Sequence, residues 1–269
     1  MTRRIWWGDF HTTEFEGLDP DRVIAVLPLA AIEQHGPHLP VSTDTSIMNG
    51  MIETVAKMLP PEPSGDLDIR FLPVQAVGKS NEHLAFPGTL TIPATVLIEY
   101  WCELGASVAR AGIRKLVLVN SHGGNEEIMG IVARELRVRH AMMVVKSSWM
   151  RFGVPDGLYG EIESKYGIHG GDRETSLMLH FRPDLVDMDR AENFESRVVE
   201  AEKAFKHLKH TGTHAFAWMS GDLNPAGTVG EAAMATADKG WATAEHQAAG
   251  FVELLADLRK ARLTDWIRD

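Results

Sequence analysis

The first 150 residues alternate between short apolar runs and longer segments in which apolar residues recur every three or four positions. The run 23–27 (Val-Ile-Ala-Val-Leu) is typical of a buried parallel strand. Between Ile47 and Leu59 the apolar residues follow the spacing of one helix face. Together these segments predict a strand, a loop and a helix in succession.

The same alternation continues along the chain. It predicts further strands at 69–77, 115–119 and 141–146, and helices at about 93–110 and 126–137. We expect a surface loop at 60–65 and, at 78–89, a loop rich in groups that could line a pocket. The start of another helix falls within 170–180, followed by a glycine-rich connection at 211–230 and a long amphipathic helix at 235–263.

Strands alternating with helices are typical of an α/β fold. We therefore expect a mostly parallel β-sheet flanked by helices on both faces. Without an internal repeat or a clear linker, the sequence favours a single domain spanning 1–269. The apolar residues of the last helix favour packing on this core over contact with a neighbouring chain.

Composition narrows the classes of partner. The chain has 27 Lys and Arg against 37 Asp and Glu, a formal net charge of -10, and no basic cluster with interleaved aromatics, which argues against nucleic acid. No apolar run approaches the roughly 20 residues of a membrane span. The single cysteine, Cys102, has no intrachain partner, and residues 1–10 lack a signal-peptide stretch, so we expect a cytoplasmic protein.

The end of the first predicted strand carries the most informative chemistry. Glu33 and His35 stand two apart, which on an extended chain places both side chains on the same face. Asp44 follows where a helix begins. Two carboxylates and an imidazole favour zinc or manganese over calcium as a bound metal.

Two further glycine-containing turns carry similar groups. His122 lies in 120–125 (Asn-Ser-His-Gly-Gly-Asn), and His169 and Glu174 lie in 169–176 (His-Gly-Gly-Asp-Arg-Glu-Thr-Ser). Because the carboxyl ends of parallel strands meet at one edge of a sheet, we expect the three turns to converge. Their glycines would let the backbone pass close to an ion or a substrate.

Each candidate ligand has another explanation when taken alone. Asp44 suits a helix N-cap, and Glu174 suits the first turn of a helix, where the helix dipole stabilises a carboxylate. His122 could be an ordinary hydrogen-bonded loop histidine. Their shared position after apolar strands favours the metal site, because packing alone would place apolar or small residues there.

Other polar groups fall in the same loops. Bound metal ligands need hydrogen-bond partners that fix their orientation, so we regard four residues as candidates to contact the substrate or to support the ligands: His38, Ser80, His83 and Asn125. Ordinary solvent-facing loop positions would explain each of them as well.

Taken together, these motifs resemble the creatininase (creatinine amidohydrolase) family. The resemblance runs from about residue 6 to 240 and includes 33–40 (Glu-Gln-His-Gly-Pro-His-Leu-Pro) and 86–89 (Phe-Pro-Gly-Thr) besides the two turns above. It implies one α/β domain, a centre of two divalent zinc or manganese ions, with iron as a further candidate, and assembly as a homohexamer.

The resemblance also implies a role for each ligand. Glu33 and His122 would hold one ion, His35 and Glu174 the other, and Asp44 would bridge both, while His169 matches the position that handles protons. Creatininases proper carry a glutamate two residues after the His122 position, where this chain has Gly124. The glycine resembles the broader family, whose members cleave formamides, short peptides and, in one case, a ring bond of an oxidised inositol.

We therefore expect a dinuclear-metal hydrolase that cleaves an amide or cyclic amide C–N bond of a small molecule. A hydroxide held between two ions would attack the carbonyl, and His169 would protonate the leaving nitrogen. The alternatives are a metal-dependent peptidase or deformylase, a hydrolase of an oxidised cyclic polyol, and a non-catalytic metal-dependent or small-ligand binding protein. The presence of His169 beside five ligand positions argues against the last.

Overall fold

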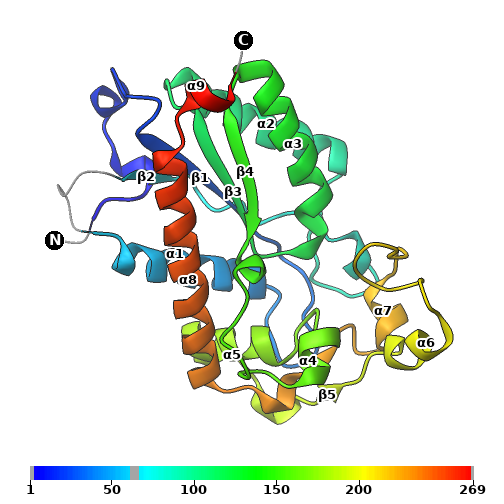
Figure 1. The fold of residues 1–269 in the computed structure, drawn as a ribbon. Helices are drawn as coiled ribbons and strands as arrows, with labels where there is room; N and C mark the ends of the chain where they lie inside the picture. Colours follow the sequence, from blue (N-terminus) through cyan, green and yellow to red (C-terminus); the bar gives the residue numbers. More distant parts are fainter. Residues whose placement is uncertain (1–2, 61–66, 268–269) are drawn as a thin grey trace.

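The fold is built on a sheet of four parallel strands in the order β2-β1-β3-β4 (Figure 1). This computed structural model describes residues 3–60 and 67–267. The sheet strands are β1 (Val23–Leu29), β2 (Asp68–Phe71), β3 (Lys115–Asn120) and β4 (Met143–Ser148). All four strands point the same way, so their carboxyl ends meet at one edge.

Helices cover both faces of the sheet because β1 and β3 are apolar on both sides. Ile24, Val26 and Val117 pack toward α1 (Thr43–Met58) and α8 (Ala237–Lys260). The alternate residues of β1 and β3 pack toward α2 (Ala94–Arg110) and α3 (Glu126–His140) on the other face. The expected fold class is thereby confirmed.

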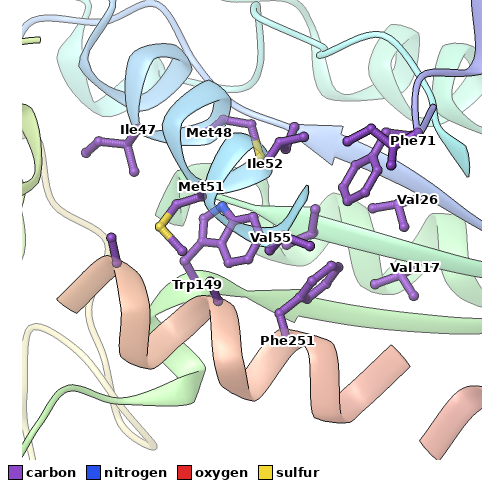
Figure 2. Packing of buried hydrophobic residues seen from close by; sticks show 14 of the residues in the cluster. Val26, Ile47, Met48, Met51, Ile52, Val55, Phe71, Val117, Trp149 and Phe251 are labelled. Atoms are coloured by element: carbon purple, nitrogen blue, oxygen red, sulfur yellow. The ribbon is translucent and has the colours of Figure 1, made fainter. Parts of the chain in front are cut away.

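Large side chains fill the layer between α1, α8 and the sheet. Figure 2 shows Trp149 and Phe251 between the two helices, with Met51 and Val55 of α1 beside them. The Trp149 and Phe251 rings meet edge to face with centroids 5.0 Å apart. This packing fixes α1, and with it the turn that carries Asp44, against the sheet.

Helix α5 (Asp172–Phe181) lies against α8 with very little space between them. A Cβ atom at Gly240 would stand 1.9 Å from the Ser176 carbonyl oxygen, so only glycine permits this approach. Because Glu174 lies in the first turn of α5, the crossing also sets the position of that carboxylate.

The remaining elements gather at the carboxyl end of the sheet or close to the chain terminus (Figure 1). The first group consists of α4 (Glu161–Tyr166), β5 (Asn193–Phe194), α6 (Val198–Ala204), α7 (Ser220–Leu223) and β6 (Gly230–Glu231). Strands β5 and β6 pair antiparallel. Helix α9 (Leu263–Trp266) follows α8.

The boundaries differ from the sequence-based ones in two places. The strand expected at 69–77 ends at Phe71, because Pro73 has no N–H to donate to the ladder. Helix α3 continues to His140 and ends at Ala141 in the left-handed region, so β4 begins two residues later than expected. The loop expected at 60–65 lies largely outside the described residues. Within the described ranges, no helix has the length and apolar character needed to cross a membrane.

Candidate metal centre

The segment after β1 brings Glu33, His35 and Asp44 into one buried cluster. The Glu33 N–H donates to the Val41 carbonyl, which holds the segment against the start of α1. Gly36 makes the intervening turn with φ +74°, a conformation that favours glycine. All three polar side chains are at most 2% exposed.

Asp44 lies between two pairs of polar side chains. Its Oδ1 is 3.5 Å from His35 Nε2, which is in turn 3.8 Å from Glu174 Oε2. Its Oδ2 is 3.6 Å from His122 Nδ1, which is 3.1 Å from Glu33 Oε1. One carboxylate thus faces two separate groups of ligand atoms.

Backbone carbonyls determine which nitrogen each of these imidazoles presents. His35 Nδ1 lies 3.0 Å from the Glu33 carbonyl oxygen, and His122 Nε2 lies 2.7 Å from that of Lys79. Since a carbonyl only accepts hydrogen bonds, both nitrogens donate to it. His35 Nε2 and His122 Nδ1 are therefore the nitrogens that face the carboxylates, and these are the nitrogens that would ligate a metal ion.

The charges in the cluster are strongly coupled. Burial alone would lower the pKa of both histidines, but the carboxylates outweigh it and raise the pKa of His35 to about 9 and that of His122 to about 10. Burial and the neighbouring carboxylates raise the pKa of Glu174 to about 7, and burial also raises that of Asp44. The carboxylates repel one another unless positive charge lies between them.

The donor set fits divalent metal ions. Both Glu33 carboxylate oxygens, Asp44 Oδ2 and His35 Nε2 are buried and have no hydrogen-bond partner among residues 3–60 and 67–267. Buried carboxylate oxygens without partners are costly, and a bound cation is one way to remove that cost. The ligand atoms of His35, Asp44 and Glu174 also lie within 4.8 Å of one another.

His169 and His83 lie beside the ligand cluster with their rings stacked, centroids 4.2 Å apart. His169 Nδ1 is 3.6 Å and His83 Nε2 is 3.3 Å from Glu33 Oε1. Burial lowers the pKa of His83 to about 4 and holds that of His169 well below its usual value, so both rings are neutral at pH 7. A cavity of about 230 Å³, lined in part by His169 and Glu174, opens next to them.

The other three residues that we selected from the sequence lie around the cluster rather than inside it. His38 Nε2 is bonded to Thr175 Oγ1 at 2.9 Å, and Ser80 Oγ is 3.5 Å from His122 Nε2. The amide of Asn125 is completely engaged: its Nδ2 donates to the Ala30 carbonyl and Asn120, and its Oδ1 accepts from the Lys79 N–H. Asn125 thus ties three loops together.

Sequence reasoning gave no role to Glu82, which the structure places beside His122. Glu82 Oε1 is 3.6 Å from His122 Nε2 and stands directly over Gly124, where a Cβ atom would be 2.6 Å from it and 2.2 Å from the Lys79 carbonyl oxygen. The loop 79–82 thus occupies the space that a side chain at position 124 would need. The only feature of the sequence that could have pointed to Glu82 is its position next to His83 in a polar loop.

Gln34 was also missed as a functional residue, although it stands between two expected ligands. Its side chain contacts His83 and lies close to His169, and its amide is buried. The alternation that places Glu33 and His35 on one face assigns Gln34 to the other. The chain, however, turns at Gly36, whose N–H donates to Gln34 Oε1, and the Gln34 amide lies at the nitrogen-bearing edges of the two rings.

Carboxylates and imidazoles gathered at the carboxyl edge of a parallel sheet are the kind of donor set that metal-dependent hydrolases use. Within that class the chain belongs to the creatininase family, because the family model described as creatinine amidohydrolase matches residues 8–255. A manganese form of creatininase superposes with a TM-score of 0.74 at 26% identity, covering 95% of this chain and 98% of that one. The expected family and the expected enzyme class are thereby confirmed.

Two characterised relatives differ in the reactions that their names describe. The mycofactocin precursor peptide peptidase of Mycolicibacterium smegmatis is 35% identical over 62% of this chain, and the match spans 61% of the length of that relative. The creatinine amidohydrolase of Pseudomonas putida is 31% identical over 71% of this chain and 76% of its own length.

Proposed function

We propose that this protein hydrolyses an amide or cyclic amide C–N bond of a small molecule with two divalent ions, zinc or manganese, iron being a further candidate. Glu33 and His122 would hold one ion, His35 and Glu174 the other, and Asp44 both. The observation that carries this proposal is the position of Asp44, whose two oxygens face two separate groups of ligand atoms.

When bound, a pair of such ions lowers the pKa of a water between them and polarises the substrate carbonyl. His169 supplies the proton transfer: Nδ1 takes the proton that the attacking water loses and delivers it to the leaving nitrogen. This role is supported by the neutral state of the ring and by the 3.6 Å distance from Nδ1 to Glu33 Oε1.

Metal content and a substrate panel test the proposal. Protein purified and loaded with zinc or manganese should hold about two equivalents by elemental analysis, and a chelator should abolish turnover. The panel contains lactams, hydantoins, formamides, dipeptides and an oxidised inositol. His169→Ala should keep both ions and lose most turnover. Less than one equivalent of metal after loading, or a fully active His169→Ala variant, would contradict the proposal.

A peptide bond is the second candidate for the scissile bond, because the peptidase of Mycolicibacterium smegmatis is a relative at 35% identity. The metal chemistry is the same for both, and only the shape of the substrate pocket differs. Turnover of dipeptides without turnover of lactams or hydantoins would select it. In either case we expect a small-molecule or short-peptide substrate and a protein that works in the cytoplasm.

A further inference from the structure

The orientation of the Gln34 side-chain amide is fixed by two backbone groups. Its Oε1 accepts from the Gly36 N–H at 2.9 Å, and its Nε2 donates to the Gly227 carbonyl at 2.5 Å. A reversed amide would place oxygen against oxygen and N–H against N–H. Gly227 has φ +76°, and a Cβ atom there would lie 2.6 Å from Gln34 Oε1, so the close approach requires glycine.

This amide determines which nitrogen of His83 carries hydrogen. The second hydrogen of Gln34 Nε2 points to His83 Nδ1, 2.7 Å away. His83 Nδ1 must therefore be the bare, accepting nitrogen, and the ring proton resides on Nε2. That N–H faces Glu33 Oε1 at 3.3 Å.

The backbone carbonyl of Gln34 fixes the ring of His169, and here the nitrogen that faces Glu33 is the bare one. His169 Nε2 lies 2.7 Å from the Gln34 carbonyl oxygen and donates to it, which leaves Nδ1 bare and facing Glu33 Oε1 at 3.6 Å. Gln34 Nε2 is also 3.2 Å from His169 Nε2, but both of these atoms carry hydrogen, so the contact with the carbonyl is the hydrogen bond.

The four imidazoles at the site differ in whether they donate a hydrogen bond to a neighbouring group or accept one from it. His35, His122 and His169 each donate one N–H to a backbone carbonyl, which leaves the other nitrogen of each ring free to bind an ion or accept a proton on the side of the cluster. His83 instead accepts from an amide through Nδ1, so the nitrogen that it turns toward the cluster is the one that keeps its hydrogen.

We infer that Gln34 is a positioning residue that gives the site one proton acceptor, His169, and one fixed hydrogen-bond donor, His83, aimed at the same point. Resting on the proposed function, this inference adds a catalytic residue to it. His169 moves the proton, whereas His83 keeps its proton: its Nε2–H, which faces Glu33 Oε1 at 3.3 Å, would donate a hydrogen bond to a substrate carbonyl oxygen placed beside that point as negative charge develops there. No proton leaves His83, so its ring stays neutral through the reaction and has the same protonation state before and after each turnover.

Nitrogen NMR of the zinc-loaded full chain tests the inference without any substrate. In protein labelled with ¹⁵N-histidine, long-range ¹H–¹⁵N correlations distinguish bare from protonated ring nitrogens, and His83→Asn and His169→Asn spectra assign the two rings. We expect Nε2–H with bare Nδ1 for both. A carboxylate in Gln34→Glu only accepts, so His83 should change to Nδ1–H. Gln247→Glu is the matched control, since Gln247 is a buried glutamine that also donates to a glycine carbonyl, that of Gly153.

Kinetics separate a hydrogen-bond donor from a base. An amide nitrogen can replace His83 Nε2 as a donor but cannot carry a proton, so His83→Gln should retain a substantial part of kcat. His83→Ala should lose it by a factor on the order of 10²–10³, with metal content unchanged in both variants.

Three results would overturn the inference: a protonated Nδ1 on His83 in the wild type, an unchanged His83 signal in a folded Gln34→Glu variant, or equal activity of His83→Gln and His83→Ala. If Gln34→Glu fails to fold, the wild-type spectrum still decides. If the spectra agree but no panel compound turns over, the proposed function fails and the assignment of the two rings stands.

Discussion

The Asp44 carboxylate lies between two groups of ligand atoms, one on the His35 side and one on the His122 side. Glu174 lies on the His35 side, 22% exposed at its side chain, whereas Glu33 on the other side is 1% exposed. Removing one charge at Glu174 should therefore affect one ion and spare the other.

Glu174→Gln should lower the bound metal from about two equivalents to about one, because a neutral amide is a much weaker ligand than a carboxylate. Elemental analysis after dialysis measures this directly. Glu99→Gln, on the exposed face of α2, provides the matched control and should retain two equivalents. Two equivalents in Glu174→Gln would remove Glu174 from the ligand set.

His38 should make the folded protein sensitive to acid. Burial, helped by the charge of His35, lowers the pKa of His38 to about 4, whereas an unfolded histidine titrates near 6.5. Between pH 4 and pH 6.5 the unfolded chain binds a proton at His38 that the folded protein does not bind. The stability that the neutral His38 contributes is therefore fully present above pH 6.5 and is lost as the pH falls toward 4.

Urea unfolding in excess chelator should show this difference. Between pH 7 and pH 5 the wild type should lose about 1–2 kcal/mol more than His38→Gln, which keeps an amide nitrogen near Thr175 and does not titrate. Equal losses in the two proteins would show that His38 is not held neutral by the fold.

The sequence supplied most of the ligand cluster but not its supporting residues. Glu33, His35, Asp44 and His122 follow the ends of β1 and β3, and the shared edge of a parallel sheet brings such residues together. Glu174 was expected to follow a third strand end, but it lies in the first turn of α5, which comes after α4. Gln34 and Glu82 depend on how separate loops meet. No periodicity within one segment indicates that a glutamine amide will contact ring nitrogens of two imidazoles from other loops.

At the scale of elements, α5 and α8 cross so closely that Gly240 leaves no room for a side chain. Gly240→Ala should destabilise the protein by about 1–3 kcal/mol or more, because the added methyl group would meet the Ser176 backbone. In contrast, the nearest atom to a Cβ at Gly130, within α3, is Lys146 Nζ at 3.8 Å.

Gly130→Ala should therefore stabilise the protein by about 0.5–1 kcal/mol, the usual gain in helix propensity. Urea unfolding of the two alanine variants measures both effects. Unchanged or increased stability of Gly240→Ala would contradict the tight crossing between α5 and α8.

The element pattern was predictable where apolar periodicity was strong. The positions of β1, β3, α1, α2 and α8 followed from it, because each buries a continuous face against the sheet. The end of β2 did not, since the apolar residues continue past Pro73 while regular pairing is interrupted there and resumes only as a single bridge between Gln75 and Leu29. The α3 boundary was missed because Ala141 caps the helix in a left-handed conformation that its side chain does not favour.

At the scale of the whole molecule, the family resemblance predicts a homohexamer. Large apolar side chains remain exposed on several helices, among them Val138 (72%), Trp241 (55%) and Tyr100 (46%), and such surface is available to neighbouring chains. Light scattering coupled to size exclusion should give a mass of about six times 29.7 kDa. A mass equal to one chain at micromolar concentration would contradict the prediction.

The lack of space over Gly124 limits which substitutions position 124 can accept. The backbone of Lys79 and the Glu82 carboxylate already fill it, so a glutamate introduced at position 124 alone would be excluded by its own first side-chain carbon. Evolution from this chain toward family members with a glutamate there must first remodel the 79–82 loop. The order of substitutions is therefore constrained, and Gly124→Glu should be tolerated only in a background where that loop has already moved.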